Sequence, residues 1–143
     1  MKNMRLFIVI VWALFLGLHT FTDNLENLLS HQSINFTWHS SPYYHNFFNV
    51  SDITWIHPNF YLIKFGHFIG FGILDLFIFL WLTSHRKSML LTFNFAVFTE
   101  VLQLYFGRDG RLYDVIIDSL GIVMVYQMLK HLSKSEKASI PYE

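Results

Sequence analysis

The chain has 143 residues, of which 53% are hydrophobic, 19% are aromatic and only 14% are charged. Because soluble domains carry about 25% charged residues, this composition excludes an ordinary soluble protein and predicts a membrane protein. The 10 basic residues balance 10 acidic ones without clustering, which excludes nucleic-acid binding, and the absence of cysteine excludes disulfides and thiolate chemistry.

Four apolar segments follow one another along the chain. The first runs from Leu6 to Leu18 behind Lys2 and Arg5, and we predict a retained signal anchor because no small-residue cleavage site follows it. The other three cover about 60–82, 89–106 and 112–129. They predict an all-α, integral membrane four-helix bundle. Its expected parts are a first transmembrane helix at 1–21, an extracytoplasmic loop at 22–59, a three-helix core at 60–129 and a cytoplasmic tail at 130–143.

The basic residues predict the orientation of the bundle, since Lys and Arg beside a span are retained in the cytoplasm. Seven fall on one side of the expected spans, namely Lys2, Arg5, Arg86, Lys87, Lys130, Lys134 and Lys137. Arg86 and Lys87 are expected in the link between the second and third spans. Both termini are therefore predicted to face the cytoplasm, as in a multi-pass protein of the cell membrane. Segment 22–59 holds no Lys or Arg and is expected outside; its histidines (His31, His39, His45 and His57) lack the spacing of a helical metal site.

Polar residues on three spans share one depth. A rise of about 1.5 Å per residue places His67, Glu100 and Asp118 about 9 to 11 Å below the outer interface. A second tier one turn nearer the outside, together with the rim of the bundle, contains Lys64, Gln103, Asp114, Arg108 and Arg111. A charge at the centre of a span costs about 2.5 to 3.5 kcal/mol to insert, so such residues face the bundle interior and mark function. These eight residues form the predicted ligand-binding site; the alternative is that they only hold the helices together.

Two further expectations concern helix packing. Asp75 lies near the cytoplasmic half of the second span, at the level of Asn94 on the third, and the two are predicted to form a hydrogen-bonded pair. Gly66 and Gly70 form a Gly-x-x-x-Gly pattern, which predicts a helix-packing face.

The polar motifs resemble those of a known family in their order and spacing. Lys64-x-x-His67-Phe68-x-x-Phe71, then Glu100-x-x-Gln103, Gly107-Arg108-x-Gly110 and Asp114-x-x-x-Asp118-x-x-Gly121 are similar to the signatures of the VanZ-like family of small bacterial membrane proteins. The resemblance covers roughly 60–125 and makes the three-helix core VanZ-like. Phe106 stands where the family often has Pro, and Asp118 where it often has Asn. The family is named after a member linked to teicoplanin resistance, which implies a role in the cell envelope.

Our leading hypothesis is a VanZ-like envelope protein whose outward-facing site binds an anionic lipid or a lipid-linked cell-wall precursor and affects glycopeptide (teicoplanin) susceptibility. Lys64, Arg108 and Arg111 would bind the anion. One alternative is a membrane-embedded enzyme acting on a lipid head group, with His67 and Glu100 as the catalytic candidates in acid-base or metal chemistry. Another is a small transporter or a structural assembly factor. The leading hypothesis requires no cofactor and no metal; its partners are membrane lipids, and the sequence does not determine the oligomeric state.

Overall fold

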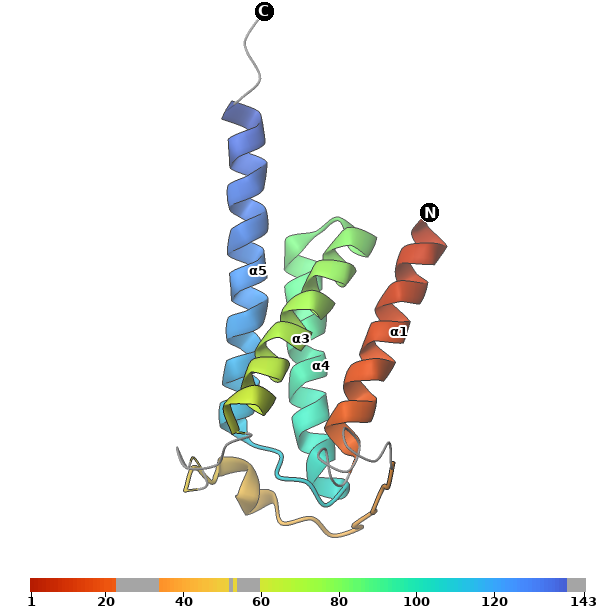
Figure 1. The fold of residues 1–143 in the computed structure, drawn as a ribbon, viewed down its shortest axis with the longest axis vertical. Coiled ribbons are helices and arrows are strands. Elements are labelled where there is room, and N and C mark those ends of the chain that lie inside the picture. Colours follow the sequence, from red (N-terminus) through yellow and green to blue (C-terminus); the bar gives the residue numbers. More distant parts are fainter. Residues whose placement is uncertain (23–33, 52, 54–59, 139–143) are drawn as a thin grey trace, which may run out of the picture.

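The computed structural model describes residues 1–22, 34–51, 53 and 60–138. Its helices are α1 (Lys2–Phe21), the short 3-10 helix η1 (Tyr44–Phe48), α3 (Phe60–Leu82), α4 (His85–Tyr105) and α5 (Leu112–Ala138). The described residues contain no strand, and four helices, α1, α3, α4 and α5, are long and apolar enough to cross a membrane. The amino end of α1 and the carboxyl end of α5 lie at the same end of the bundle (Figure 1). The prediction of an all-α protein with four helices long and apolar enough to cross a membrane is confirmed for the described residues.

Two helix boundaries differ from the sequence prediction. Helix α4 already begins at His85, so Arg86 and Lys87 lie in its first turn and not in the link. Thr83, at φ 53, reverses the chain directly after α3. Helix α5 continues past Leu129 to Ala138. Both differences arise because hydropathy detects the apolar part of a helix, whereas a helix can continue into polar residues beyond the lipid.

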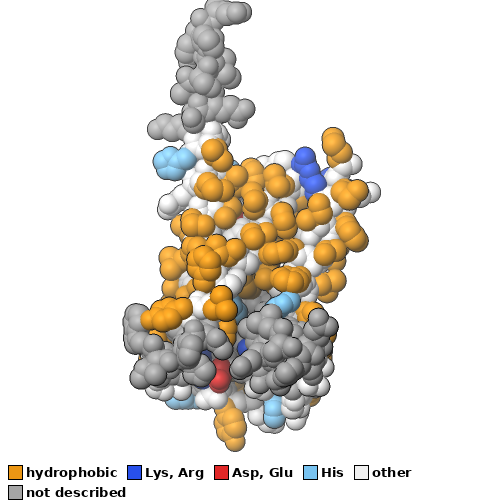
Figure 2. All heavy atoms as spheres, viewed as in Figure 1, with side chains coloured by type: hydrophobic (Ala, Val, Ile, Leu, Met, Phe, Trp, Pro, Cys, Tyr) orange, Lys and Arg blue, Asp and Glu red, His pale blue; other side chains and the backbone are white. Residues whose placement is uncertain are grey.

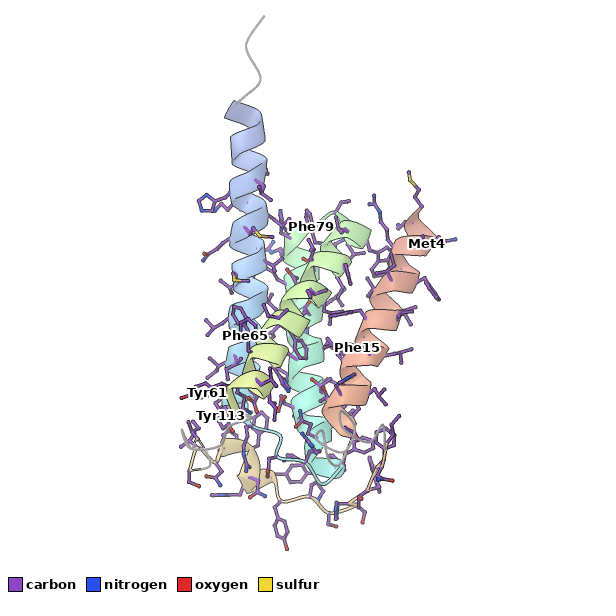
Figure 3. The ribbon with its side chains drawn as sticks, viewed as in Figure 1. Met4, Phe15, Tyr61, Phe65, Phe79 and Tyr113 are labelled. Atoms are coloured by element: carbon purple, nitrogen blue, oxygen red, sulfur yellow. The ribbon has the colours of Figure 1, made fainter. Side chains whose placement is uncertain are left out.

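The outer surface of the bundle is apolar. Large hydrophobic side chains are exposed on all four long helices, for example Leu14 on α1, Phe65 on α3, Phe98 on α4 and Leu120 on α5. Figure 2 shows these side chains covering the middle of the bundle on the face in view. Exposed Tyr61 lies near the lower end of the bundle (Figure 3), where aromatic rings commonly meet the membrane surface. The surface suits a lipid environment.

Glycines allow α3 to approach two other helices closely. A Cβ at Gly121 of α5 would lie 2.1 Å from the Phe68 carbonyl oxygen, and one at Gly70 would lie 2.7 Å from Leu16 of α1. At Gly66 nothing lies within 4 Å of such an atom. Of the two glycines in the predicted Gly-x-x-x-Gly face, only Gly70 therefore packs closely against a neighbouring helix. The α3–α5 contact depends instead on Gly72 and Gly121.

Asp75 lies in a separate buried polar layer nearer the termini. Its carboxylate accepts a hydrogen bond from the Thr92 hydroxyl (3.4 Å), and both residues are buried. Asn94 is exposed and donates to the carbonyl of Leu90 on its own helix (2.7 Å). The predicted pair of Asp75 and Asn94 is thus wrong. Two residues along a helix turn the side chain by about 200°, so Thr92 faces Asp75 while Asn94 points away.

The described part of 22–59 lies across the end of the bundle opposite the termini (Figure 1). The backbone N–H of His39 donates to the Tyr105 carbonyl at 2.7 Å, and the Trp38 ring stacks on the Tyr105 ring at 5.2 Å between centroids. We call residues 34–51 the capping segment. His31 and His57 lie outside the described residues, whereas His39 and His45 are exposed in the capping segment.

Candidate functional site

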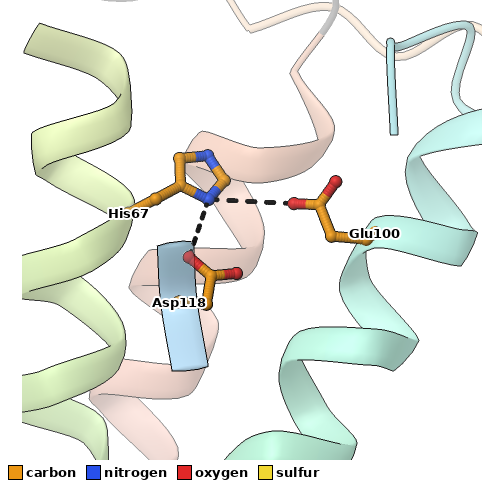
Figure 4. Close-up of side chains that lie close together, drawn as sticks. All are labelled: His67, Glu100 and Asp118. Atoms are coloured by element: carbon orange, nitrogen blue, oxygen red, sulfur yellow. Dashed lines mark ion pairs between the residues drawn. The ribbon is translucent and has the colours of Figure 1, made fainter. Parts of the chain in front are cut away.

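Three spans bring one side chain each to a common point inside the bundle. His67 of α3 directs its Nδ1 atom at Asp118 Oδ1 of α5 (3.3 Å) and at Glu100 Oε1 of α4 (3.7 Å), as Figure 4 shows. Glu100 and Asp118 are fully buried, and 18% of the His67 side chain is exposed. The helix-rise argument placed these residues at one depth, and the structure also turns them toward each other.

A second tier lies one helical turn away on the same two helices. Lys64 precedes His67 on α3, Asp114 precedes Asp118 on α5, and the Lys64 ammonium donates to Asp114 Oδ2 at 2.7 Å. The Lys64 side chain is 18% exposed and that of Asp114 is 4% exposed. Lys64 Nζ also lies 4.8 Å from the centre of the Tyr113 ring. The tier thus joins a nearly buried carboxylate to a cation that reaches the surface.

The connection from α4 to α5 holds Glu100 in place. Glu100 Oε1 accepts a hydrogen bond from the Gln103 amide (2.9 Å), and Oε2 accepts one from the backbone N–H of Arg111 (3.0 Å). A Cβ at Gly110 would lie 2.0 Å from the Glu100 carbonyl oxygen, so only glycine allows the connection to pass this close to α4. The Glu100 side chain therefore has a fixed position.

The two arginines of this connection differ in their surroundings. Arg111 is 4% exposed, and its guanidinium donates to the Asn46 carbonyl of the capping segment and to Asp109 (3.0 Å). Arg108 is half-buried, and its backbone N–H donates to the Gln103 carbonyl at 2.9 Å. Arg111 thus ties the connection to the capping segment, while Arg108 lies at the rim.

Several buried polar atoms of this site have no hydrogen-bond partner among the described residues. They are His67 Nδ1, Asp114 Oδ1 and both carboxylate oxygens of Asp118. A buried polar atom without a partner costs about 1 to 3 kcal/mol, and native proteins contain few of them. Their concentration at one end of the bundle makes these residues the candidate functional site.

Sequence reasoning missed the contribution of the capping segment. Asn46 acts through its backbone carbonyl, which no residue type can reveal. Tyr44 and Tyr105 share a hydrogen bond between their hydroxyl groups, and this bond raises the pKa of Tyr44 above its usual value. Nothing in the sequence indicates that Trp38 and Tyr44 contact Tyr105, because this contact depends on the path of the chain.

A sequence model of the VanZ/LLP1 family matches residues 5–133. The chain belongs to the VanZ/LLP1 family. It is also similar to the uncharacterised membrane protein YwnJ of Bacillus subtilis (strain 168), with 34% identity over 116 residues that cover 80% of this chain and 82% of that protein. No solved structure gives a significant match. The VanZ/LLP1 match extends over α1 and the capping segment as well as the three-helix core, so it is longer than the motifs alone indicated.

In this VanZ/LLP1 protein, the residues that carry the family motifs are the ones that meet. The imidazole of His67 and the carboxylates of Glu100 and Asp118 can exchange a proton or bind a cation. Lys64 and Arg108 lie nearer the rim, where a cation can attract an anionic group. The site therefore combines buried acidic residues with basic residues nearer the end of the bundle.

Proposed function

We propose that this protein acts in the cell envelope, where it binds the anionic head group of a membrane lipid or lipid-linked cell-wall precursor and thereby affects glycopeptide (teicoplanin) susceptibility. The observation that carries the proposal is the Lys64 ammonium, 18% exposed beside buried polar atoms of His67, Asp114 and Asp118 that lack hydrogen-bond partners among the described residues. The cation would attract the anionic group, and the carboxylate oxygens would accept hydrogen bonds from hydroxyl or ammonium groups of the same head group. Side chains that only hold helices together satisfy one another, whereas these retain hydrogen-bonding capacity for a ligand.

The distribution of charge supports an outward-facing site. Lys2 and Arg5 begin α1, and Arg86 and Lys87 lie in the first turn of α4, at the end of the bundle that also holds the termini. Basic residues favour the cytoplasmic side of a membrane. In this orientation the polar site faces the outside, where the head groups of the outer leaflet and exported wall precursors are found.

Two cations support an anionic ligand. The Lys64 ammonium carries a positive charge, and its side chain is 18% exposed although it pairs with Asp114. Arg108 presents a planar guanidinium, which suits the paired oxygens of a phosphate. Both residues lie nearer the end of the bundle than His67 does, so a lipid phosphate that entered from that end would meet Lys64 and Arg108 first.

The test is the retention of lipid by the purified protein. Wild type, Arg108→Gln and Lys64→Gln would be purified in a mild detergent, and the anionic lipids that remain bound would be quantified by mass spectrometry. Lys130→Gln serves as the matched control, because Lys130 is an exposed cation on α5 far along the helix from the site. We expect the first two variants to lose most of the retained anionic lipid and the control to keep it. Equal retention by all four proteins would refute the proposal.

The same variants test the cellular role. Expressed in a strain that lacks the protein, Arg108→Gln should accumulate in the membrane like wild type but fail to restore glycopeptide susceptibility to the wild-type level. Immunoblots of the membrane fraction provide the control for abundance. If the variant disappeared from the membrane, the polar residues would serve only to hold the helices together.

A second candidate function is enzymatic, and the position of His67 between two carboxylates favours it. An imidazole in this position could act as a general acid or base on a lipid head group, with Glu100 as its partner. Incubating the protein with labelled anionic lipids separates the two functions. Release of a head group by wild type but not by His67→Gln would show catalysis, and recovery of unchanged lipid would show binding alone.

A further inference from the structure

We propose that His67, Glu100 and Asp118 form a binding site for a divalent transition-metal ion, zinc or manganese. Each residue offers one ligand atom, and the three atoms lie within 4.8 Å of one another. The three ligands come from three different helices, α3, α4 and α5, so a bound ion would also hold these helices together.

The distances between the ligand atoms fit a metal ion. Ligands bound to a tetrahedral ion at about 2.0 to 2.2 Å lie about 3.4 Å from one another. His67 Nδ1 lies 3.3 Å from Asp118 Oδ1 and 3.7 Å from Glu100 Oε1. Figure 4 shows the imidazole nitrogen facing both carboxylates. All three atoms lie within 4.8 Å of one another, so the carboxylate oxygens would have to move closer together for all three atoms to bind one ion.

The hydrogen bonds of the site favour an ion over a direct contact. Asp118 is fully buried, yet neither of its oxygens has a hydrogen-bond partner among the described residues, and the same holds for His67 Nδ1. A protonated Nδ1 has one hydrogen and can serve only one of the two carboxylates well. A metal ion accepts lone pairs from all three residues at once.

The balance of charge leads to the same ligand. Lys64 pairs with Asp114, whereas Glu100 and Asp118 both pair with His67, whose imidazole carries at most one positive charge. Two ionised carboxylates beside one imidazole would leave excess negative charge in a medium of low dielectric, so they must take up either protons or a cation. A divalent cation would neutralise both carboxylates while the imidazole binds in its neutral form.

The chemistry of the ligands narrows the choice of metal. An imidazole nitrogen with two carboxylate oxygens suits zinc or manganese better than calcium or magnesium, which prefer oxygen alone. Glu100 is already held by Gln103 and by the Arg111 backbone, as ligands of metal sites usually are. With three protein ligands, one coordination position remains for an oxygen atom of a ligand. That this atom belongs to a lipid head group rests on the proposed function; the metal site does not.

Metal binding can be measured directly on the full-length protein. Protein purified in detergent and treated with a chelator would be titrated with zinc chloride and, separately, manganese chloride by isothermal titration calorimetry, and bound metal would be counted by elemental mass spectrometry. We expect one ion per chain, and a loss of affinity of about 100-fold or more in Asp118→Asn and in His67→Gln. Asp118→Asn preserves the shape of the side chain. His131→Ala is the matched control, because His131 is an exposed histidine on α5.

The possible outcomes separate the metal site from its alternatives. Equal affinity of wild type and Asp118→Asn, or a loss of binding in His131→Ala, would show adventitious binding by surface histidines and overturn the proposal. Absence of binding by a wild-type protein that unfolds cooperatively on heating would also overturn it, and would leave His67 paired directly with the two carboxylates. Metal binding without retained anionic lipid would refute the proposed function and keep the metal site. Lipid retention by a protein that binds no metal would refute the metal site and keep the proposed function.

Discussion

Replacing Gly121 by alanine should force α3 and α5 apart and disturb the site one turn away. The new Cβ would lie 2.1 Å from the Phe68 carbonyl oxygen, whereas ordinary contact begins at 3.4 Å. A backbone carbonyl in a helix cannot rotate away, so the two helices would have to move apart. The separation needed is at most the difference between 3.4 and 2.1 Å, about 1.3 Å. The distance from His67 Nδ1 to Asp118 Oδ1, now 3.3 Å, would grow by a similar amount.

The expected loss of stability follows from two opposing effects. Forcing an extra methyl group into a packed interface costs up to about 3 kcal/mol. Alanine is about 1 kcal/mol more favourable than glycine inside a helix, which offsets part of this cost. The net loss is about 2 kcal/mol, and at roughly 4 °C per kcal/mol for a chain of this size the Tm should fall by about 8 °C. Affinity for the proposed metal should fall as well, since Asp118 moves away from His67.

Thermal unfolding in one detergent, followed by circular dichroism, measures the effect. Gly66→Ala is the matched control, because nothing lies within 4 Å of a Cβ at Gly66 and its Tm should stay the same or rise. A Gly121→Ala protein with the Tm and metal affinity of wild type would refute the reasoning. A Gly66→Ala protein that lost as much stability would show that both glycines have a role other than close packing.

Three further predictions concern polar contacts. Lys64→Ala should lower the free energy of unfolding by about 3 kcal/mol, because it leaves the Asp114 carboxylate buried without its cation. Adding Asp114→Asn to this variant should recover most of the lost stability. Chemical denaturation measures both effects, and additive losses in the double variant would contradict the ion pair. Asp75→Asn should retain as much anionic lipid as wild type, because Asp75 belongs to a separate polar layer. If this variant lost as much lipid as Lys64→Gln or Arg108→Gln, Asp75 would belong to the site. Tyr105→Phe should lower the pKa of Tyr44 toward its usual value, which ultraviolet titration detects. Because the hydrogen bond raises that pKa, its contribution to stability should be present below the usual tyrosine pKa and disappear as pH rises through the raised one.

The sequence alone predicted the four long helices and the common level of three polar residues. Apolar runs of membrane-spanning length indicated the four long helices found among the described residues. The regular rise of an α-helix then placed His67, Glu100 and Asp118 at one level, and these three side chains do meet. Both inferences succeed because hydropathy and helix rise are local properties, which depend on neighbours in the chain and not on the rest of the fold.

The tertiary structure decided which side chains face each other. Asp75 contacts Thr92 and not Asn94, because the rotation of α4 about its own axis is set by packing against its neighbours. Gly121 packs closely while Gly66 faces open space, since only the arrangement of the bundle determines where two helices cross. The capping segment joins the site through backbone groups, whose position depends on the path of the chain. The position of a residue along a helix can thus be predicted from sequence, whereas the direction in which its side chain points is determined only when the bundle is assembled.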